Sequence, residues 1–191
     1  MGKAMRPLYR VGATSLLALL WSGCAGHVVY ASPAYRGRVV DAETGQPLAG
    51  AVVLAVWYQE TPVAPHGPAK DYHDALELLT DANGEFAVPE RTHFTPIGKI
   101  LAPEFVVYSP GYASFPGLGA WPQDSREVDA AYAKREFNFK LTRLKTREER
   151  LRRQYPFGLL KVPDAKMPNL IRLVNDEGHA LGLPPIRSLG R

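Results

Sequence analysis

Apolar and polar positions alternate in several short stretches between residues 35 and 143, and this period of two predicts β-strands. The alternation is clearest near the end, where Phe137, Phe139 and Leu141 fall on one face and Asn138 and Lys140 on the other. The predicted strands cover residues 38–41, 51–58, 76–80, 85–88, 105–108, 112–115 and 137–141. Short strands separated by frequent turns favour an all-β sandwich over a parallel α/β sheet.

The turns between these strands contain residues that permit sharp bends. The segment "ETGQP" at 43–47 has a glycine that accepts a positive φ and a proline that stops ladder pairing. Asn83-Gly84 lies between residues 76–80 and 85–88, and this dipeptide predicts a hairpin that pairs the two strands. Residues 74–79 could instead form a helical turn, because Ala, Leu and Glu are good helix formers. Their run straight into the hairpin favours a strand.

The composition changes after residue 143. The segment "KTREERLRRQY" is dense in charge and predicts a solvated helix that ends at Pro156. Pro168 opens a second short helix, and Gly178 suits its C-terminal end. The apolar stripe of this helix consists of Leu170, Ile171, Leu173 and Val174. We expect the stripe to dock on the sandwich or on a partner, and the last residues to be extended.

The amino terminus has the features of an export signal. Lys3, Arg6 and Arg10 precede an apolar run over residues 11–21. This run is shorter than the roughly 20 residues that a spanning helix needs, and it has the length of a secretory h-region. The run ends just before Ser22, Gly23 and Cys24, and Cys24 is the only cysteine in the chain.

The residues before Cys24 resemble the lipobox of bacterial lipoproteins. The resemblance implies cleavage before Cys24 and a diacylglycerol on its sulfur, and Ala25 implies sorting to the periplasmic face of the outer membrane. Trp21 departs from the usual aliphatic residue at its position. A lone cysteine cannot form an internal disulfide, so lipidation explains it economically. The alternative is an ordinary cleaved signal and an incidental cysteine.

Charge is distributed unevenly along the chain, which has a formal net charge of +4. Residues 145–191 contain ten Lys or Arg against five Asp or Glu, whereas residues 24–143 contain ten against fourteen. The basic character thus belongs to the signal and the tail, so nucleic acid is not an expected partner of the domain. The tail could meet anionic lipid or be a solvated helix.

The sequence "GRVVDAETGQPLAGAVV", followed by "TDANGEF" and "SPGY", resembles the carboxypeptidase regulatory-like domain over residues 36–141. The resemblance implies a seven-stranded Greek-key transthyretin-like β-sandwich, and a module that is mostly non-catalytic in its family. No peptidase domain accompanies it here, and the connections at 59–75 and 91–104 are long. The expected organisation is a signal peptide at 1–23, a tether at 24–34, the sandwich at 35–143 and a basic helical extension at 144–191.

Acidic residues and a histidine in the first long connection are weak candidates for a metal site. Asp71, His73, Asp74 and Glu77 could bind a divalent cation through carboxylate oxygens and an imidazole. In an extended segment, alternation places Asp71, His73 and Glu77 on one face and Asp74 on the other. The spacing matches no established site, so a solvated loop is the stronger interpretation. We expect no cofactor.

The sequence gives little support for catalysis. His66, His73 and His93 could be general bases, but no G-x-S-x-G motif is present, and nothing in the sequence pairs Ser109 or Ser114 with a histidine. Intradiol dioxygenases share the style of the opening motif, but their iron needs two closely spaced histidines, and no H-x-H occurs. Hydroxyisourate hydrolases end in Tyr-Arg-Gly-Ser, whereas this chain ends in Ser-Leu-Gly-Arg. A small metal-dependent enzyme on such a sandwich remains an alternative, and a non-enzyme is the prediction.

Aromatic residues are the remaining candidates for binding. Trp57, Tyr72 and Trp121 could stack on sugar or peptide groups, although packing in the core is the commoner fate of an aromatic side chain. The sequence therefore predicts a non-catalytic, lipid-anchored envelope protein whose sandwich is a binding or structural module. Its expected partners are the membrane, through lipid on Cys24, and an envelope protein or a glycan. A carbohydrate- or peptidoglycan-binding lipoprotein is the main alternative.

Overall fold

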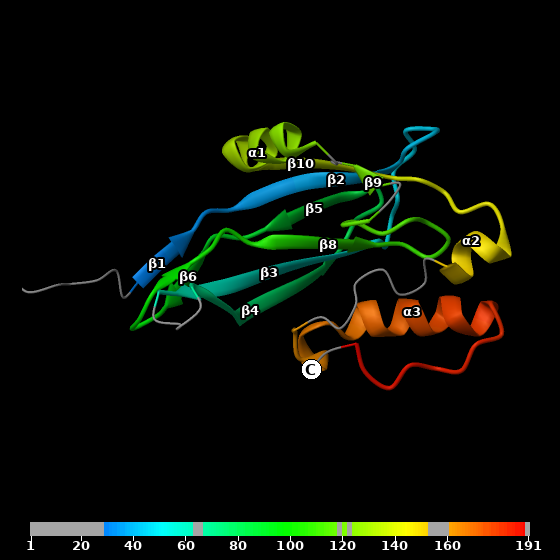
Figure 1. The fold of residues 1–191 in the computed structure, drawn as a ribbon. Helices are drawn as coiled ribbons and strands as arrows, with labels where there is room; N and C mark the ends of the chain where they lie inside the picture. The colour runs from blue at the N-terminus through cyan, green and yellow to red at the C-terminus, as the bar shows by residue number, and fades with distance from the viewer. Residues whose placement is uncertain (1–28, 63–66, 118–119, 122–123, 153–160, 190–191) are drawn as a thin grey trace, which may run out of the picture.

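The protein is mostly β-structure with a smaller helical part, as the hydrophobic pattern predicts. The computed structural model describes residues 29–62, 67–117, 120–121, 124–152 and 161–189. Within these residues the chain forms ten strands and three α-helices. Two main sheets face each other, a two-stranded ribbon extends from one end, and helices pack around the sheets (Figure 1).

The first sheet has the strand order β5 (Glu85–Val88), β2 (Tyr35–Asp41), β10 (Glu136–Leu141) and β9 (Ala120–Trp121). β2 and β10 run parallel, and the other pairs are antiparallel. The predicted alternation in β10 is confirmed, because Phe137, Phe139 and Leu141 are buried and the residues between them are exposed.

The second sheet is built around β3 (Val52–Thr61). β4 (Ala69–Leu79) pairs along one side of it, and both β8 (Glu104–Tyr108) and β7 (Lys99–Ile100) pair along the other. Val53, Ala55 and Trp57 of β3 belong to the core between the sheets, whereas Val52, Leu54 and Val56 belong to a second core outside it. Burial of both faces explains why residues 51–57 are continuously apolar rather than alternating.

Aromatic rings fill the core between the two sheets. Phe105 of the second sheet meets Phe137 of the first with ring centroids 4.6 Å apart, and Phe137 stacks on Phe139 at 5.5 Å. Phe86 and Tyr35 complete this cluster from β5 and β2. Rings from both sheets therefore hold the layers together, since aromatic residues contribute the largest buried areas in a core.

The predicted hairpin at Asn83-Gly84 is wrong in its pairing, although the turn is there. β4 pairs with β3 in the second sheet, whereas β5 pairs with β2 in the first, so the turn carries the chain between sheets. Gly84 has a φ of 72°, and a Cβ on it would lie 2.5 Å from the Val39 carbonyl oxygen. The glycine is thus required by a close approach to β2 rather than by a two-strand hairpin.

The predicted strand at 112–115 is also absent as a strand. Phe115 makes one isolated bridge to Val107, and Tyr112 makes one to Arg143. The segment bends back along β8 without forming a ladder, because Gly111 with a φ of 78° turns the chain sharply.

A two-stranded ribbon continues the pairing of β2 with β5 beyond the sheets. It is formed by β1 (Val29–Ser32) and β6 (Arg91–Phe94). Ser32 pairs with Arg91 and Tyr35 pairs with Val88, so the register is unbroken across the gap between the strands. Residues 29–32, which the sequence assigned to a tether, are therefore part of this ribbon.

Helices pack beside the first sheet and on the outer face of the second. α1 (Ser125–Lys134), which the hydrophobic pattern did not predict, packs beside β10 and contributes Ala131 and Tyr132 to the core between the two sheets. α2 (Arg147–Arg152) corresponds to the predicted charged helix, and its continuation to Pro156 lies outside the described residues. None of the helices in the described part of the chain has the length and apolar character needed to cross a bilayer.

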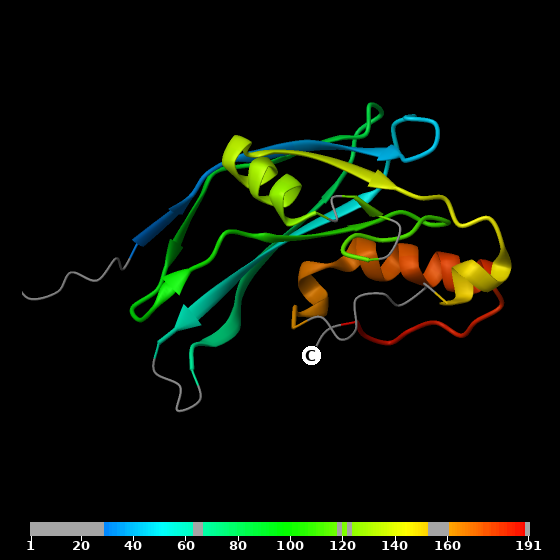
Figure 2. The ribbon, with the colours of Figure 1, turned by 45° about the horizontal axis from the view of Figure 1, so that its top comes forward.

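The last helix, α3 (Pro168–Ala180), lies on the outer face of the second sheet, after a short 3₁₀ turn, η2 (Asp164–Lys166). Leu170 and Val174 are buried against Val52 and Leu54, so the expectation that the stripe docks on the sheets is confirmed (Figures 1 and 2). The predicted end at Gly178 is wrong, since the helix continues to Ala180 and Gly178 is buried inside it.

Candidate functional site

Several chemically versatile side chains lie together where the ribbon leaves the sheets. They are Ser32, Trp57, His73, Asp74, Arg91 and His93, and we call them the histidine cluster. They come from β1, β3, β4 and β6, so the end of β3 and β4 meets the start of the ribbon here.

A β-bulge in β4 places two consecutive side chains of the cluster on one side. Trp57 pairs with Asp74 and Tyr58 pairs with Tyr72, so His73 is an extra residue without a pairing partner. His73 then contacts His93, while Asp74 contacts Arg91. The predicted alternation, which placed these two side chains on opposite faces, is therefore wrong, because the bulge interrupts the period of two.

Short polar contacts and ring contacts hold the cluster together. The indole Nε1 of Trp57 donates to Ser32 Oγ at 3.0 Å, and both residues are fully buried. The guanidinium of Arg91 lies 5.4 Å from the Trp57 ring and forms a 2.7 Å ion pair with Asp74. His93 is 4% exposed, and its ring centroid lies 5.1 Å from that of Trp57.

The electrostatics of the cluster favour a neutral His93. Burial lowers the pKa of its imidazole, and the neighbouring His73 and Arg91 lower it further against the opposing charge of Asp74. Its Nε2 is buried and has no hydrogen-bond partner. Burial alone would raise the pKa of Asp74, but hydrogen bonds from Lys166 and the Ala75 N–H, with the charge of Arg91, hold it below its usual value.

The weak candidates for a metal site do not converge. Asp71 is exposed, His73 turns toward the ribbon, and Glu77 points to the opposite side of β4. Within the described ranges, no group of three or more His, Cys, Asp or Glu side chains is placed to hold a metal ion. His66, a further candidate base, lies outside these ranges.

Glu77 has a structural contact that the sequence did not suggest. Its carboxylate accepts from the backbone N–H groups of Asn169 at 2.9 Å and Leu170 at 2.7 Å, and also from the Asn169 side chain at 2.9 Å. These are unpaired donors of the first turn of α3, which has no side-chain cap of its own. Glu77 therefore caps the helix from the sheet and fixes where α3 docks.

The two aromatic candidates that the structure describes do not form the platform that the carbohydrate-binding alternative requires. Trp57 is 0% exposed, because it lies on the inner face of β3, and so it offers no surface to a ligand. Tyr72 is half-buried and packs with Tyr58 against the core beneath α3. The side chain of Trp121 lies outside the described residues, as does Cys24.

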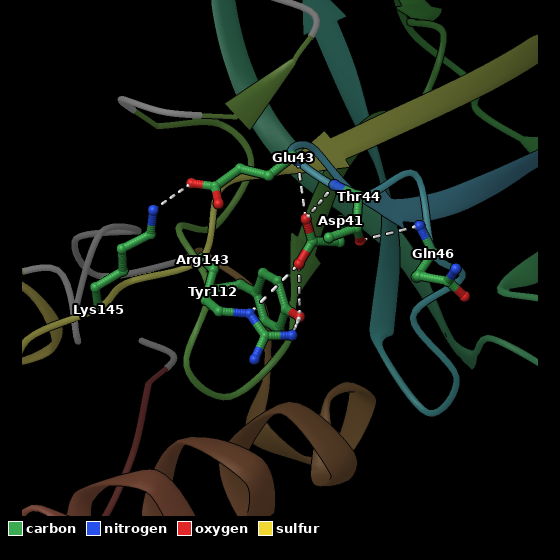
Figure 3. A network of polar contacts seen from close by, with 7 residues as sticks. All are labelled: Asp41, Glu43, Thr44, Gln46, Tyr112, Arg143 and Lys145. Carbon is green, nitrogen blue, oxygen red and sulfur yellow. Dashed lines mark hydrogen bonds and ion pairs between the residues drawn. The ribbon is translucent and has the colours of Figure 1, made fainter.

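A second polar network lies at the opposite end of the sheets and centres on Asp41 (Figure 3). One carboxylate oxygen of this 2% exposed residue accepts from the N–H groups of Glu43 at 2.8 Å and Thr44 at 3.0 Å. The other accepts from Tyr112 Oη at 3.1 Å and Arg143 Nε at 3.4 Å. Asp41 thus joins the end of β2 to two later segments of the chain.

These contacts keep Asp41 ionised. Burial would raise its pKa, but the hydrogen bonds from Thr44, Glu43, Tyr112 and Arg143 outweigh burial and lower the pKa to about 2. Arg143 also donates to the Tyr112 hydroxyl at 2.6 Å. Sequence analysis did not single out this network, although its signal was present, since Asp41 and Tyr112 belong to the two quoted motifs "GRVVDAETGQPLAGAVV" and "SPGY".

No family model and no curated protein matches this chain. The resemblance to the carboxypeptidase regulatory-like domain therefore stays a prediction. What the structure adds is that residues from the separate motif fragments contact one another, and that they do so through a network that stabilises turns.

A groove lies on the outer face of the first sheet. Its volume is about 1100 Å³, and it runs over β5, β2 and β10 beside α1. The charged residues that line it are Arg36, Arg38, Lys134, Lys140, Asp81, Glu85, Glu127 and Glu136. Because both signs of charge are present in equal number, the groove suits a polar partner surface better than a strongly charged polymer.

Proposed function

We propose that this protein is a non-catalytic, lipid-anchored protein of the cell envelope, whose two-sheet domain is a binding or structural module. Under this proposal, Cys24 carries the lipid and the domain lies at the periplasmic face of the outer membrane. The finer description of the fold, a seven-stranded Greek-key transthyretin-like sandwich, belongs to the same proposal. The passage of the chain from β4 to β5 between the sheets supports it.

The position where the chain enters the domain carries the proposal. β1 begins at Val29, five residues after Cys24, at the free end of the ribbon (Figure 1). An anchor at Cys24 would therefore hold one end of an elongated domain. The Asp41 turn and the helices α2 and α3 would then project away from the bilayer.

The acidic side chains make contacts that stabilise the fold, and this supports a non-catalytic role. Asp41 stabilises a turn, Asp74 pairs with Arg91 and Lys166, and Glu77 caps α3. Ser32 is fully buried and bound by the Trp57 indole, so its hydroxyl is not open to a substrate. Each of these four groups thus has a contact that stabilises the fold.

The anchor is tested by mass spectrometry and fractionation of the full chain made in bacteria. We expect lipid mass on Cys24 and recovery of the protein with outer membranes, whereas Cys24→Ala should be found in the soluble periplasm. Trp21→Leu, which restores an aliphatic residue three positions before Cys24, is the matched control and should remain membrane-bound. Membrane recovery of Cys24→Ala equal to that of the natural chain would contradict the proposal.

The binding role is tested by photo-cross-linking in cells. A photoreactive residue replaces Asn138, an exposed residue that lines the groove, and the matched control is the same replacement at Arg172 on the exposed face of α3. We expect a discrete product with an envelope protein or a glycan from position 138 alone. Equal products from both positions would contradict a binding role for the groove.

A further inference from the structure

Exposed apolar side chains gather at the free end of the ribbon. In the described part of the chain, four large apolar residues are exposed, and three of them lie here: Val29 at 61%, Phe94 at 64% and Ile97 at 56%. Val29 and Phe94 are direct cross-strand partners, so their side chains share one face. Ile97 follows Phe94 by three residues. We call these three residues the ribbon tip.

The loop that presents Ile97 is held in place rather than loose. The carbonyl oxygen of Ile97 accepts from Gln59 Nε2 at 2.6 Å and from Thr95 Oγ1 at 2.7 Å. Gly98 has a φ of 83°, and a Cβ on it would lie 2.2 Å from the Glu60 carbonyl oxygen. The loop therefore packs directly on the end of β3, and the exposure of Ile97 is built into the fold.

The ribbon tip lies close to the proposed lipid attachment. Five peptide units separate the Cα atoms of Cys24 and Val29, so these atoms are at most ~18 Å apart even in a fully extended chain. A lipidated Cys24 sits at the bilayer surface. The exposed apolar face of the ribbon is thus confined to the neighbourhood of that surface.

Charges near the tip neutralise one another. Lys99 pairs with Glu60 at 3.0 Å, and Lys70 pairs with Glu104. An anionic lipid would therefore find little net positive charge to attract it. The chemistry of the tip suits insertion of apolar side chains between lipid head groups rather than electrostatic binding.

We propose that the ribbon tip inserts into the surface of the phospholipid bilayer to which Cys24 is anchored, and thereby sets the orientation of the domain. This inference rests on the proposed lipid anchor. The tip adds a second apolar contact to the acyl chains, so the domain cannot rotate freely about its tether. The groove and the Asp41 turn then face away from the membrane in a defined direction.

The test is tryptophan quenching by bromine-labelled lipids. The full acylated chain carrying Phe94→Trp or Ile97→Trp is placed on phosphatidylcholine vesicles, with or without phosphatidylglycerol, and its emission is compared with that of the unsubstituted protein. The matched control is Leu79→Trp. Leu79 is 45% exposed, but it lies at the opposite end of β4 from Ala69, ~33 Å away along the strand. All three replacements are at exposed positions.

We expect brominated acyl chains to reduce the added emission at positions 94 and 97 about twofold, because interfacial apolar groups reach ~5–10 Å into the boundary of the acyl region. The emission at position 79 should not change, and salt or phosphatidylglycerol should make no difference. If the protein floats with the vesicles but the emission at positions 94 and 97 is quenched no more than at position 79, the inference about the ribbon tip is overturned, while the proposed lipid anchor stands. Absence of lipid mass on Cys24, with no flotation, overturns the proposed function and this inference with it.

Discussion

Replacing the buried carboxylate of Asp41 should destabilise the fold in a pH-dependent way. Asp41→Asn keeps an oxygen that can accept from the N–H groups of Glu43 and Thr44. It replaces the oxygen that accepts from Tyr112 and Arg143 by an NH₂ group, which can only donate. The substitution thus removes the charged half of the network and leaves the turn half in place.

The magnitude follows from the pKa of Asp41. The network lowers this pKa from 3.8 to about 2. Because one pKa unit corresponds to about 1.4 kcal/mol, ionisation of Asp41 contributes about 2 kcal/mol to the free energy of unfolding at pH 7. Below pH 4 the unfolded chain takes up the proton before the folded protein does. The contribution is therefore complete above pH 4 and is lost as the pH falls toward 2.

The assay is urea unfolding followed by fluorescence of the buried Trp57, at pH 7 and at pH 3. We expect Asp41→Asn to lower the free energy of unfolding by about 2 kcal/mol at pH 7, and by about half of that at pH 3. The matched control is Asp81→Asn. Asp81 also accepts from two backbone N–H groups in a turn, of Asn83 at 2.9 Å and Glu85 at 2.8 Å, but it is exposed.

Asparagine supports such turns nearly as well as aspartate, so Asp81→Asn should cost less than about 0.5 kcal/mol at either pH. The reasoning is refuted if Asp41→Asn costs no more than Asp81→Asn at pH 7. It is also refuted if the cost of Asp41→Asn is the same at pH 7 and pH 3, because the loss would then not come from the charge.

Three other substitutions test the packing and the histidine cluster. Gly37→Ala should cost at least about 2 kcal/mol in urea unfolding, because its Cβ would lie 2.3 Å from the Phe137 carbonyl oxygen; an unchanged midpoint would contradict this. Arg150→Met should lower the free energy of unfolding by about 3–5 kcal/mol, since it leaves the 6% exposed Glu177 without its two-point ion pair of 2.5 and 2.6 Å. Adding Glu177→Leu to this variant should restore most of the lost stability. Burial lowers the pKa of His93, so the unfolded chain binds the proton before the folded protein does. The free energy of unfolding should therefore fall by up to about 1.4 kcal/mol per pH unit as the pH drops below about 6.5. His93→Phe should reduce this dependence of stability on pH between pH 7 and about 5.

The sequence predicted strands best where one face of a strand is buried and the other is exposed. β10 is such a strand, and its alternation identified its buried residues correctly. β3 was also identified, but its two buried faces make its sequence uniformly apolar, so the pattern could not show which sheet or helix covers each face.

The local sequence pattern could not predict which strands pair with each other. Asn83-Gly84 marks a reversal of the chain, but whether the flanking strands pair depends on distant residues, here Val39 and the rest of β2. α1 was missed although local signals were present. Asp124 caps its N-terminus by accepting from the Arg126 N–H at 2.9 Å, and Glu127 lies in the first turn.

The candidate site was predicted least well. Alternation placed His73 and Asp74 on opposite faces, and a single extra residue in β4 reversed that result. A bulge depends on the pairing of two strands, so no property of residues 71–77 alone could reveal it. Trp57 illustrates a different limit, because a large aromatic residue occurs in cores and also at binding surfaces, and only its neighbours decide between them.

The parallel pairing of β2 with β10 has a consequence for how the chain folds during its synthesis. Each residue from Arg36 to Asp41 meets a partner 100 positions later, between Glu136 and Leu141. A nascent polypeptide that emerges from its amino end therefore exposes one bare side of β2 until almost the whole domain has been synthesised. An unpaired strand edge is a template for association with other chains, and contacts this distant in sequence form slowly. The last strand, β10, thus covers the open side of β2, and a product truncated before residue 136 would be left with an unpaired strand edge that can associate with other chains.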